Sequence, residues 1–560
     1  MSESFESSKP SQPGQSGKPG KPGQPATSPQ PSANANANAS RALDATPLPL
    51  DASPSQLLFP TDPHEGATET TYAQNGFDPA TSTTQLSYTS ARVARRVYNR
   101  YARNAFELSG YYTDWSQYDG RLDGDFSNEA AGRGVDLMLL DPFAYDRLVV
   151  GFAGIVGDRG EKAQTIARAA TDFSRKPDQA TFVDSWGDVL AYRNCGFAGW
   201  VSNDVIPMFQ QSRAQGVLGG LRLLHARNPA LKLALAIGGW TMSQAFHALA
   251  ASRARRKTFC ASVVDLLKRF PMFSEINLDW EYPGSPGDDG NLYDDADGPN
   301  YAALVSDLKT ALIAAGRQDV EISIAASASV ADMRKANLPG LIAAGISRIN
   351  LMTYDFFGTP WAPALAHHTN LHDTNPADAG GFSIDRAVTW LRQAGVPLAK
   401  VHIGYAAYSR NALDAQITQV SGLSGTYSPG TGVSAGTFES GTTEYYDLLR
   451  NYLDLENGTT RNGFVLYTDP VADADFLFHP STGLFMSLDT PRTVRAKGDY
   501  VKRNGLGGLF TWTIDQDNGV LANAAHEGLG HRVTVSHIDM SPFYFGGKTS
   551  LDDSPVEDRA

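Results

Sequence analysis

The chain has 560 residues, enough for one large barrel with additions or for roughly three to four small domains. Hydrophobic residues make up 41% of it and aromatic residues 10%, which fits a chain that buries a sizeable core. The formal net charge of −13, with no basic stripe to offset it, argues against nucleic acid as a partner. No apolar run approaches the ~18 residues of a membrane span, so we expect none.

The N-terminal 65 residues are rich in Pro, Gly, Ser, Gln and Asn. This composition predicts a disordered, low-complexity tail, because it cannot bury a core. Residues 1–40 contain no hydrophobic segment of the kind that a secretory signal peptide requires. We therefore expect a protein that becomes extracellular or is released without a Sec signal peptide, or that otherwise stays cytoplasmic until export.

Residues 66–106 form an N-terminal extension, and its last part, 90–106, has a helical and basic pattern. Five arginines lie among apolar residues there: Arg92, Arg95, Arg96, Arg100 and Arg103. One interpretation is a helix packed on the domain with its basic face in solvent. The other is an element that docks onto a partner protein.

After this extension, short apolar runs alternate with helical segments. Eight runs read as strands: 106–112, 147–152, 231–239, 275–281, 321–326, 348–354, 400–404 and 507–512. Segments such as 301–315, 338–345, 384–395 and 490–504 read as helices between them. This alternation predicts the α/β class and a closed (β/α)₈ TIM barrel over 107–410 and 490–535, with an open doubly wound sheet as the alternative.

Two separations between strands are too long for simple βα units. Residues 153–230 form the first. The second, 411–489, is rich in Gly, Thr, Tyr and Phe and predicts a small α+β domain inserted between strands 7 and 8. Residues 536–560 are assigned to a C-terminal tail. Cys195 and Cys260 are predicted to be free core thiols, since no disulfide framework or zinc spacing is present and neither metal nor cofactor is expected.

The run 276–285, Ile-Asn-Leu-Asp-Trp-Glu-Tyr-Pro-Gly-Ser, carries the clearest chemical signal. Alternation places Asn277, Asp279 and Glu281 on one face of a strand, which Pro-Gly then terminates. Two carboxylates on a buried strand face repel each other and lose hydration, a cost that folds accept mainly at functional sites. Glu281 would lie at the carboxyl end of its strand, where α/β barrels hold their active sites. The alternative is an acidic edge strand with a solvated face.

The segment resembles the D-x-x-D-x-D-x-E signature of glycoside hydrolase family 18, the chitinases, with Ser274 and Asn277 in place of the first two Asp residues. Further motifs at predicted strand ends also resemble the family: 236–240 (Ala-Ile-Gly-Gly-Trp), 352–356 (Met-Thr-Tyr-Asp-Phe), 404–410 (Gly-Tyr-Ala-Ala-Tyr-Ser-Arg) and 508–512 (Gly-Leu-Phe-Thr-Trp). The inserted domain resembles that of bacterial chitinase A-like enzymes. The resemblance implies a chitinase that acts on chitin or chito-oligosaccharides through a deep cleft.

It also implies roles for individual residues. Glu281 would be the general acid and base, and Asp279 would hold the acetamido N–H of the substrate. Tyr354 would donate to the acetamido oxygen. Substrate would bind at the side chains of Tyr112, Phe152, Trp240, Met352, Asp355, Tyr408, Arg410 and Trp512.

Asn277 departs from the pattern. An amide cannot share a proton with Asp279 as the family's Asp does, but it can still donate a hydrogen bond to Asp279. We expect a reduced rate or a shifted pH profile, and less influence from Ser274, which lies earlier in the strand.

Other functions stay open at this point. One is a chitin-binding or structural protein with weak or no catalysis, and another is an endo-β-N-acetylglucosaminidase acting on glycoproteins. The chain also resembles the chitinase subunits of bacterial insecticidal toxin complexes, which implies a large toxin subunit as a partner through the N-terminal extension.

Overall fold

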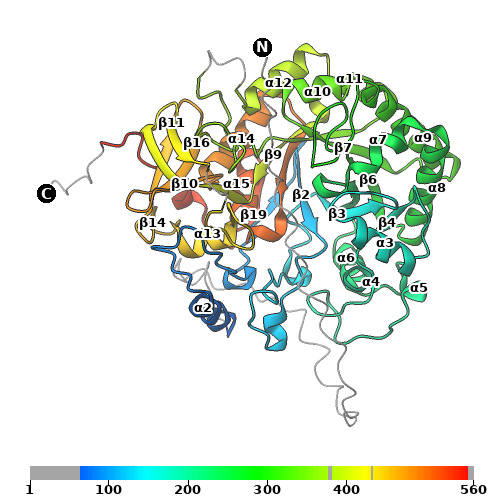
Figure 1. The fold of residues 1–560 in the computed structure, drawn as a ribbon, viewed down its shortest axis with the longest axis horizontal. Helices are drawn as coiled ribbons and strands as arrows, with labels where there is room; N and C mark the ends of the chain where they lie inside the picture. The colour runs from blue at the N-terminus through cyan, green and yellow to red at the C-terminus, as the bar shows by residue number, and fades with distance from the viewer. Residues whose placement is uncertain (1–62, 376–380, 430–432, 553–560) are drawn as a thin grey trace, which may run out of the picture.

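The computed structural model describes residues 63–375, 381–429 and 433–552 (Figure 1). Eight parallel strands pair in the order β2-β3-β5-β6-β7-β8-β9-β18 and close through β18 against β2, so the predicted barrel is confirmed. The strands are β2 Glu107–Thr113, β3 Arg147–Ile155, β5 Lys232–Gly238, β6 Phe273–Asp279, β7 Glu321–Ser327, β8 Arg348–Met352, β9 Val401–Ala406 and β18 Gly508–Trp512. A short strand, β4 Ala180–Phe182, pairs antiparallel with β3.

Helices cover the outside of the barrel (Figure 1). They are α3 Ala163–Asp172, α4 Ser185–Val189, α5 Val205–Met208, α6 Gly216–Arg227, α7 Gln244–Ala251, α8 Arg253–Arg269, α9 Asp297–Ala314, α10 Val330–Lys335, α11 Leu338–Ala344, α12 Ile384–Gln393, α14 Pro491–Asn504 and α15 Val520–Gly528. Outward residues of the strands, such as Ile276 and Leu278, pack in the same buried cluster as helix residues such as Leu304. This apolar layer drives barrel closure, because it removes one face of every strand from water.

The amino-terminal end of the barrel interior is filled by charged side chains. Arg147 contacts Glu275, lies 2.9 Å from Glu107 and 3.0 Å from Glu321. Arg348 lies 3.1 Å from the same Glu107 carboxylate. We call Glu107, Arg147, Glu275 and Arg348 the floor cluster. The two arginines hold the pKa of Glu107 below its usual range, against the effect of burial.

The insertion is an antiparallel sheet with one short helix, and it begins at Tyr408, slightly earlier than predicted. Its strands are β10 Tyr408–Gln419, β11 Ser424–Ser428, β12 Thr442–Glu444, β15 Val465–Asp469, β16 Ala474–His479 and β17 Leu484–Leu488, with the small pair β13 Leu453–Asp454 and β14 Thr459–Thr460 beside them. Helix α13 spans Tyr445–Asn451. Figure 1 shows this unit on one side of the barrel.

The predicted basic helix at 90–106 is wrong. The segment forms a 3₁₀ turn, Ala91–Val93, and a short strand, β1 Arg100–Ala102, which pairs with β19 Arg532–Val535. Its arginines contact the domain itself: Arg92 pairs with Asp119, Arg100 with Asp141 and Arg103 with Asp146. Tertiary ion pairs and strand pairing therefore replace the local helical preference. The extension's α-helix lies earlier, at α2 Pro63–Asn75.

The two predicted tails differ in how much of each the structure describes. The N-terminal tail lies outside the described residues, except for the last three, which begin α2. Three residues of the predicted C-terminal tail, Ile538, Met540 and Phe543, are buried in the main core, so part of this segment packs on the domain. Cys195 and Cys260 are free and buried, as predicted. Among the described residues, no helix has the length and apolar character needed to cross a bilayer.

Candidate active site

A groove of about 630 Å³ opens at the carboxyl ends of the barrel strands, and Asp279 and Glu281 lie in it. Asp279 ends β6, and the backbone is fixed there by local hydrogen bonds. The Asp279 carbonyl accepts from the Gly239 N–H at 2.7 Å, and the Glu281 N–H donates to Ser243 Oγ at 3.0 Å. Gly238 has φ +112°, and a Cβ there would lie 2.2 Å from the Asp279 carbonyl oxygen. Only glycine permits this approach.

The two carboxylates are buried, and within the described residues neither forms an ion pair with a cationic side chain. Asp279 is 3% exposed and Glu281 4%, and one oxygen of each has no hydrogen-bond partner there. Burial raises the pKa of Asp279. Burial, followed by the charge of Asp279, raises the pKa of Glu281 well above the ordinary value for Glu. The arrangement therefore keeps a protonated carboxylic acid in the groove at a pH where an exposed Glu is ionised.

Asn277 lies beneath this pair. The sequence suggested that its amide would donate to Asp279, but it has other partners. Its Oδ1 accepts from the Tyr111 hydroxyl at 3.0 Å, and its Nδ2 donates to Ser323 Oγ at 2.8 Å. The register of β6 against β7 puts Asn277 opposite Ser323 and so decides this pairing. Ser323 in turn donates to Glu275. Asn277 thus joins the site to the floor cluster.

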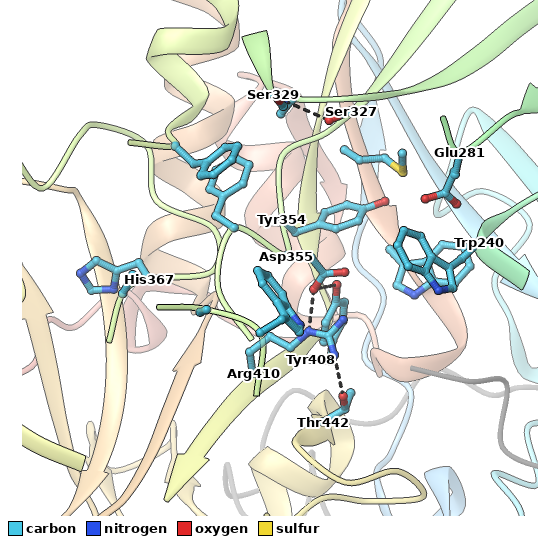
Figure 2. Close-up of a pocket in the computed structure, with 18 of the residues that line it drawn as sticks. Trp240, Glu281, Ser327, Ser329, Tyr354, Asp355, His367, Tyr408, Arg410 and Thr442 are labelled. Carbon is cyan, nitrogen blue, oxygen red and sulfur yellow. Dashed lines mark hydrogen bonds and ion pairs between the residues drawn. The ribbon is translucent and has the colours of Figure 1, made fainter. Parts of the chain in front are cut away.

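Asp355, Tyr408 and Arg410 form a second polar group in the groove (Figure 2). The Tyr408 hydroxyl donates to Asp355 Oδ1 at 2.8 Å, and Arg410 Nε donates to the same oxygen at 2.7 Å. Arg410 also donates to Thr442 of the insertion at 3.2 Å. The Arg410 charge keeps the pKa of Asp355 below its usual range although the carboxylate is buried. All three were expected in the cleft and do line the groove, and their part in substrate binding stays a prediction.

Phe152, Trp240, Met352, Tyr354 and Trp512 also line the groove as predicted. Phe152 stacks on Trp512 with ring centroids 5.8 Å apart. In Figure 2 the Tyr354 hydroxyl points toward Glu281 across the cavity. Flat apolar rings beside polar groups are the lining that a sugar ring needs for stacking and orientation.

Tyr112 is the exception among the predicted lining residues. It is 1% exposed and packs in the outer core, whereas its neighbour Tyr111 faces the groove. Successive strand residues point to opposite faces, and Leu108, which is also in the outer core, shares the parity of Tyr112. That parity was the signal in the sequence that would have selected Tyr111.

Sequence reasoning missed the wall of the groove next to the insertion. Arg133 Nε donates to Glu444 Oε1 at 2.6 Å, and Gln516 Nε2 donates to the same oxygen at 3.2 Å. Glu439 also lines this wall, and burial raises its pKa to about 8. These residues are far apart in the chain and belong to no common motif, so the sequence held no signal for their meeting.

One group of possible metal ligands, His247, Asp294 and Asp297, lies outside the groove residues. Asp297 Oδ1 lies 2.8 Å from His247 Nδ1, and its Oδ2 accepts from the N–H groups of Gly284 and Asp294, each at 3.0 Å. Asp297 Oδ2 thus holds the loop after Glu281 to the start of α9, and its Oδ1 contacts His247 of α7.

Comparison with known proteins agrees with this geometry. Residues 107–517 match the family described as Glycosyl hydrolases family 18. The chain belongs to this family. It is 42% identical over 541 residues to "Chitinase 2" of Yersinia entomophaga, covering 89% of this chain and 83% of that protein. It is 42% identical over 526 residues to "Chitinase 1" of the same organism, covering 89% of this chain and 96% of that protein.

A solved structure shares the fold of this chain. The chitinase Chi1, fitted into the three-dimensional structure of the Yersinia entomophaga toxin complex, superposes with a TM-score of 0.81 at 41% identity. The match covers 86% of this chain and 96% of that one.

Proposed function

We propose that this protein is a chitinase that hydrolyses β-1,4-linked N-acetylglucosamine polymers and oligomers with retention of configuration. The observation that carries the proposal is the buried pair Asp279 and Glu281 at the strand ends of a family 18 barrel, in an aromatic groove. Family 18 enzymes use the substrate's own 2-acetamido group as nucleophile instead of a second enzyme carboxylate. The acetamido oxygen attacks the anomeric carbon, and the glycosidic bond breaks.

Glu281 is the proposed general acid. Its raised pKa keeps the proton that the departing glycosidic oxygen takes up, and the resulting carboxylate then removes a proton from the attacking water. Asp279 accepts a hydrogen bond from the acetamido N–H, and its negative charge stabilises the cationic ring that forms. The Tyr354 hydroxyl donates to the acetamido oxygen and holds it for attack.

The remaining groove residues bind the chain. Trp512 forms the platform under the sugar, with Phe152 and Trp240 beside it. Asp355 and Arg410 hold polar groups of the substrate. Met352 packs within the groove, and Tyr408 orients Asp355.

Incubation with chito-oligosaccharides tests this function. Shorter oligomers should appear, with the β-anomer formed first in proton NMR spectra. The matched control is glucosamine oligomers of the same length, which lack the acetyl groups and should stay intact. Binding without cleavage would favour the lectin alternative. Cleavage of a high-mannose glycoprotein with chito-oligosaccharides intact would favour the endo-β-N-acetylglucosaminidase.

We propose in addition that the protein assembles with a large partner. Support comes from its likeness to Chi1, the chitinase fitted into the Yersinia entomophaga toxin complex. Arginines of segment 90–106 form ion pairs within the domain, so a basic docking helix is not part of this proposal. Size-exclusion chromatography and affinity capture from the native source test it. Recovery of a free monomer alone would contradict it.

A further inference from the structure

Part of the groove wall is held by residues that precede the barrel. Residues 83–91, which we call the strap, run beside segment 434–447 of the insertion. The Ser87 N–H donates to the Gly436 carbonyl at 2.8 Å and the Tyr88 N–H to the Thr437 carbonyl at 2.9 Å. Segment 434–447 includes the groove residues Phe438, Glu439, Thr442 and Glu444. The strap thus pairs with the backbone that carries this wall.

Side chains strengthen the pairing around one buried carboxylate, Asp447. It accepts hydrogen bonds from Ser87 Oγ at 2.5 Å, Thr89 Oγ1 at 3.0 Å and Thr437 Oγ1 at 2.6 Å. Thr437 Oγ1 in turn accepts from the Glu444 N–H at 2.8 Å. Since Asp447 is fully buried, losing donors leaves a polar group unsatisfied and the loop free to shift.

The strap also reaches the wall from the barrel side. Ser90 Oγ and the Ala91 N–H both donate to the Arg133 carbonyl, at 3.1 and 3.0 Å. The Arg133 side chain pairs with Glu444 and lies over the Phe438 ring at 5.8 Å, and Tyr88 packs edge-on against the same ring at 6.1 Å. The strap therefore bonds directly to the backbone of Arg133 and, through Thr437, to the backbone of Glu444.

This wall lies beyond Arg410 as seen from Glu281. Arg410 donates to Thr442 in the wall, whereas Asp355 lies on its other side (Figure 2). A substrate chain that extended from Glu281 past Arg410 would therefore meet the wall, whereas a short one bound at Glu281 would not reach it.

We propose that the strap, residues 83–91, positions the groove wall at 434–444 and so sets the affinity for long oligosaccharide substrates. This inference rests on the proposed chitinase function. The strap precedes residue 107, where the family match begins, so this chain's extension adds a specificity element to the family barrel. Ser87, Tyr88 and Thr89 act as positioning residues.

The test compares full-length proteins on a hexamer and on a short chromogenic chito-oligosaccharide. In the double variant Ser87→Ala, Thr89→Ala, KM for the hexamer should rise about 10-fold with kcat within about twofold. Hydrolysis of the short substrate should stay as in the wild type. The variant Ser87→Thr, Thr89→Ser keeps both hydroxyls and should restore the hexamer KM. Thr70→Ala in α2, whose hydroxyl donates to the Gly66 carbonyl of the same helix, is the matched control.

Tyr88→Ala removes only the ring against Phe438 and serves if the double variant does not fold. A lower denaturation midpoint with unchanged KM for the hexamer would overturn the proposal, because the strap would then be purely structural. An equal loss on both substrates would also overturn it, since the strap would then act on the chemistry. If the wild type cleaves neither substrate, the proposed function fails instead, which separates the two conclusions.

Discussion

Strand β6, together with the two residues after it, carries buried carboxylates to both ends of the barrel interior, and their surroundings differ between the two ends. At the floor, Glu275 contacts Arg147 and accepts from Ser323. At the opening, Glu281 has an oxygen without a partner and a pKa raised by burial and by Asp279. Both side chains are buried, so depth alone does not distinguish them.

The two ends differ in whether other groups replace the hydration that a buried carboxylate loses. A buried charge is tolerated when an opposite charge and hydrogen bonds replace its hydration, as at the floor. Without them the group keeps its proton, as at the opening. The floor therefore holds its buried charges in ion pairs, and the opening favours the protonated form of its carboxylic acid. Asn277 lies between the two ends, bonded to Tyr111 and Ser323.

Removing the proton donor should have the largest effect. In Glu281→Gln, turnover of chito-oligosaccharides should fall by roughly 10²–10⁴-fold, because an amide of the same shape cannot supply the proton. Steady-state kinetics measures the loss, and calorimetric titration with an oligosaccharide should still show binding. Turnover like that of the wild type would exclude Glu281 from the mechanism.

Removing the floor cation should cost stability instead. Arg147→Met leaves Glu275 buried beside an apolar side chain, and we expect the free energy of unfolding to fall by about 3–5 kcal/mol. Denaturant unfolding measures it. The matched control is Arg100→Met, whose exposed pair with Asp141 should contribute only ~0.2–1 kcal/mol. Equal effects of the two variants would contradict the contrast between buried and exposed pairs.

Removing the neighbouring charge at the opening should move the pH dependence. Glu281 acts when protonated, so activity is lost as pH rises through its pKa. In Asp279→Asn that pKa falls, since the negative neighbour is gone, and the alkaline limb should move to lower pH. The profile of kcat/KM against pH for the free enzyme is the measurement. An unmoved limb would mean that the two groups are uncoupled.

The smallest change is expected at the residue between the two ends. Asn277→Asp adds a titrating group below Asp279 and should broaden or shift the pH–rate profile without abolishing activity. Asn277→Ser, which adds no charge, is the control for altered packing. An identical profile for wild type and Asn277→Asp over acidic and neutral pH would show that position 277 does not affect the pair.

Local patterns predicted much of the site because its residues come from strand ends. Asp279, Glu281, Tyr354 and Trp512 each follow an apolar run that reads as a strand, and a parallel barrel brings all such ends to one face. The choice between Tyr111 and Tyr112 failed because the shared parity of Tyr112 and the outward-facing Leu108 was not used. The Arg133–Glu444 contact was not predictable, since 311 residues separate the two side chains.

The sequence by itself determined the barrel, the insertion and the position of Asp279 and Glu281 at a strand end, because period-two alternation and strand-terminating Pro-Gly are encoded within a few residues. Only the tertiary structure decided which charges are paired, because pairing depends on distances between distant strands. Arg147 neutralises Glu275 at the floor, while Glu281 keeps its proton at the opening. The same holds for segment 90–106: its local pattern favoured a helix, but ion pairs to Asp119, Asp141 and Asp146 and pairing with β19 gave it an extended course along the barrel.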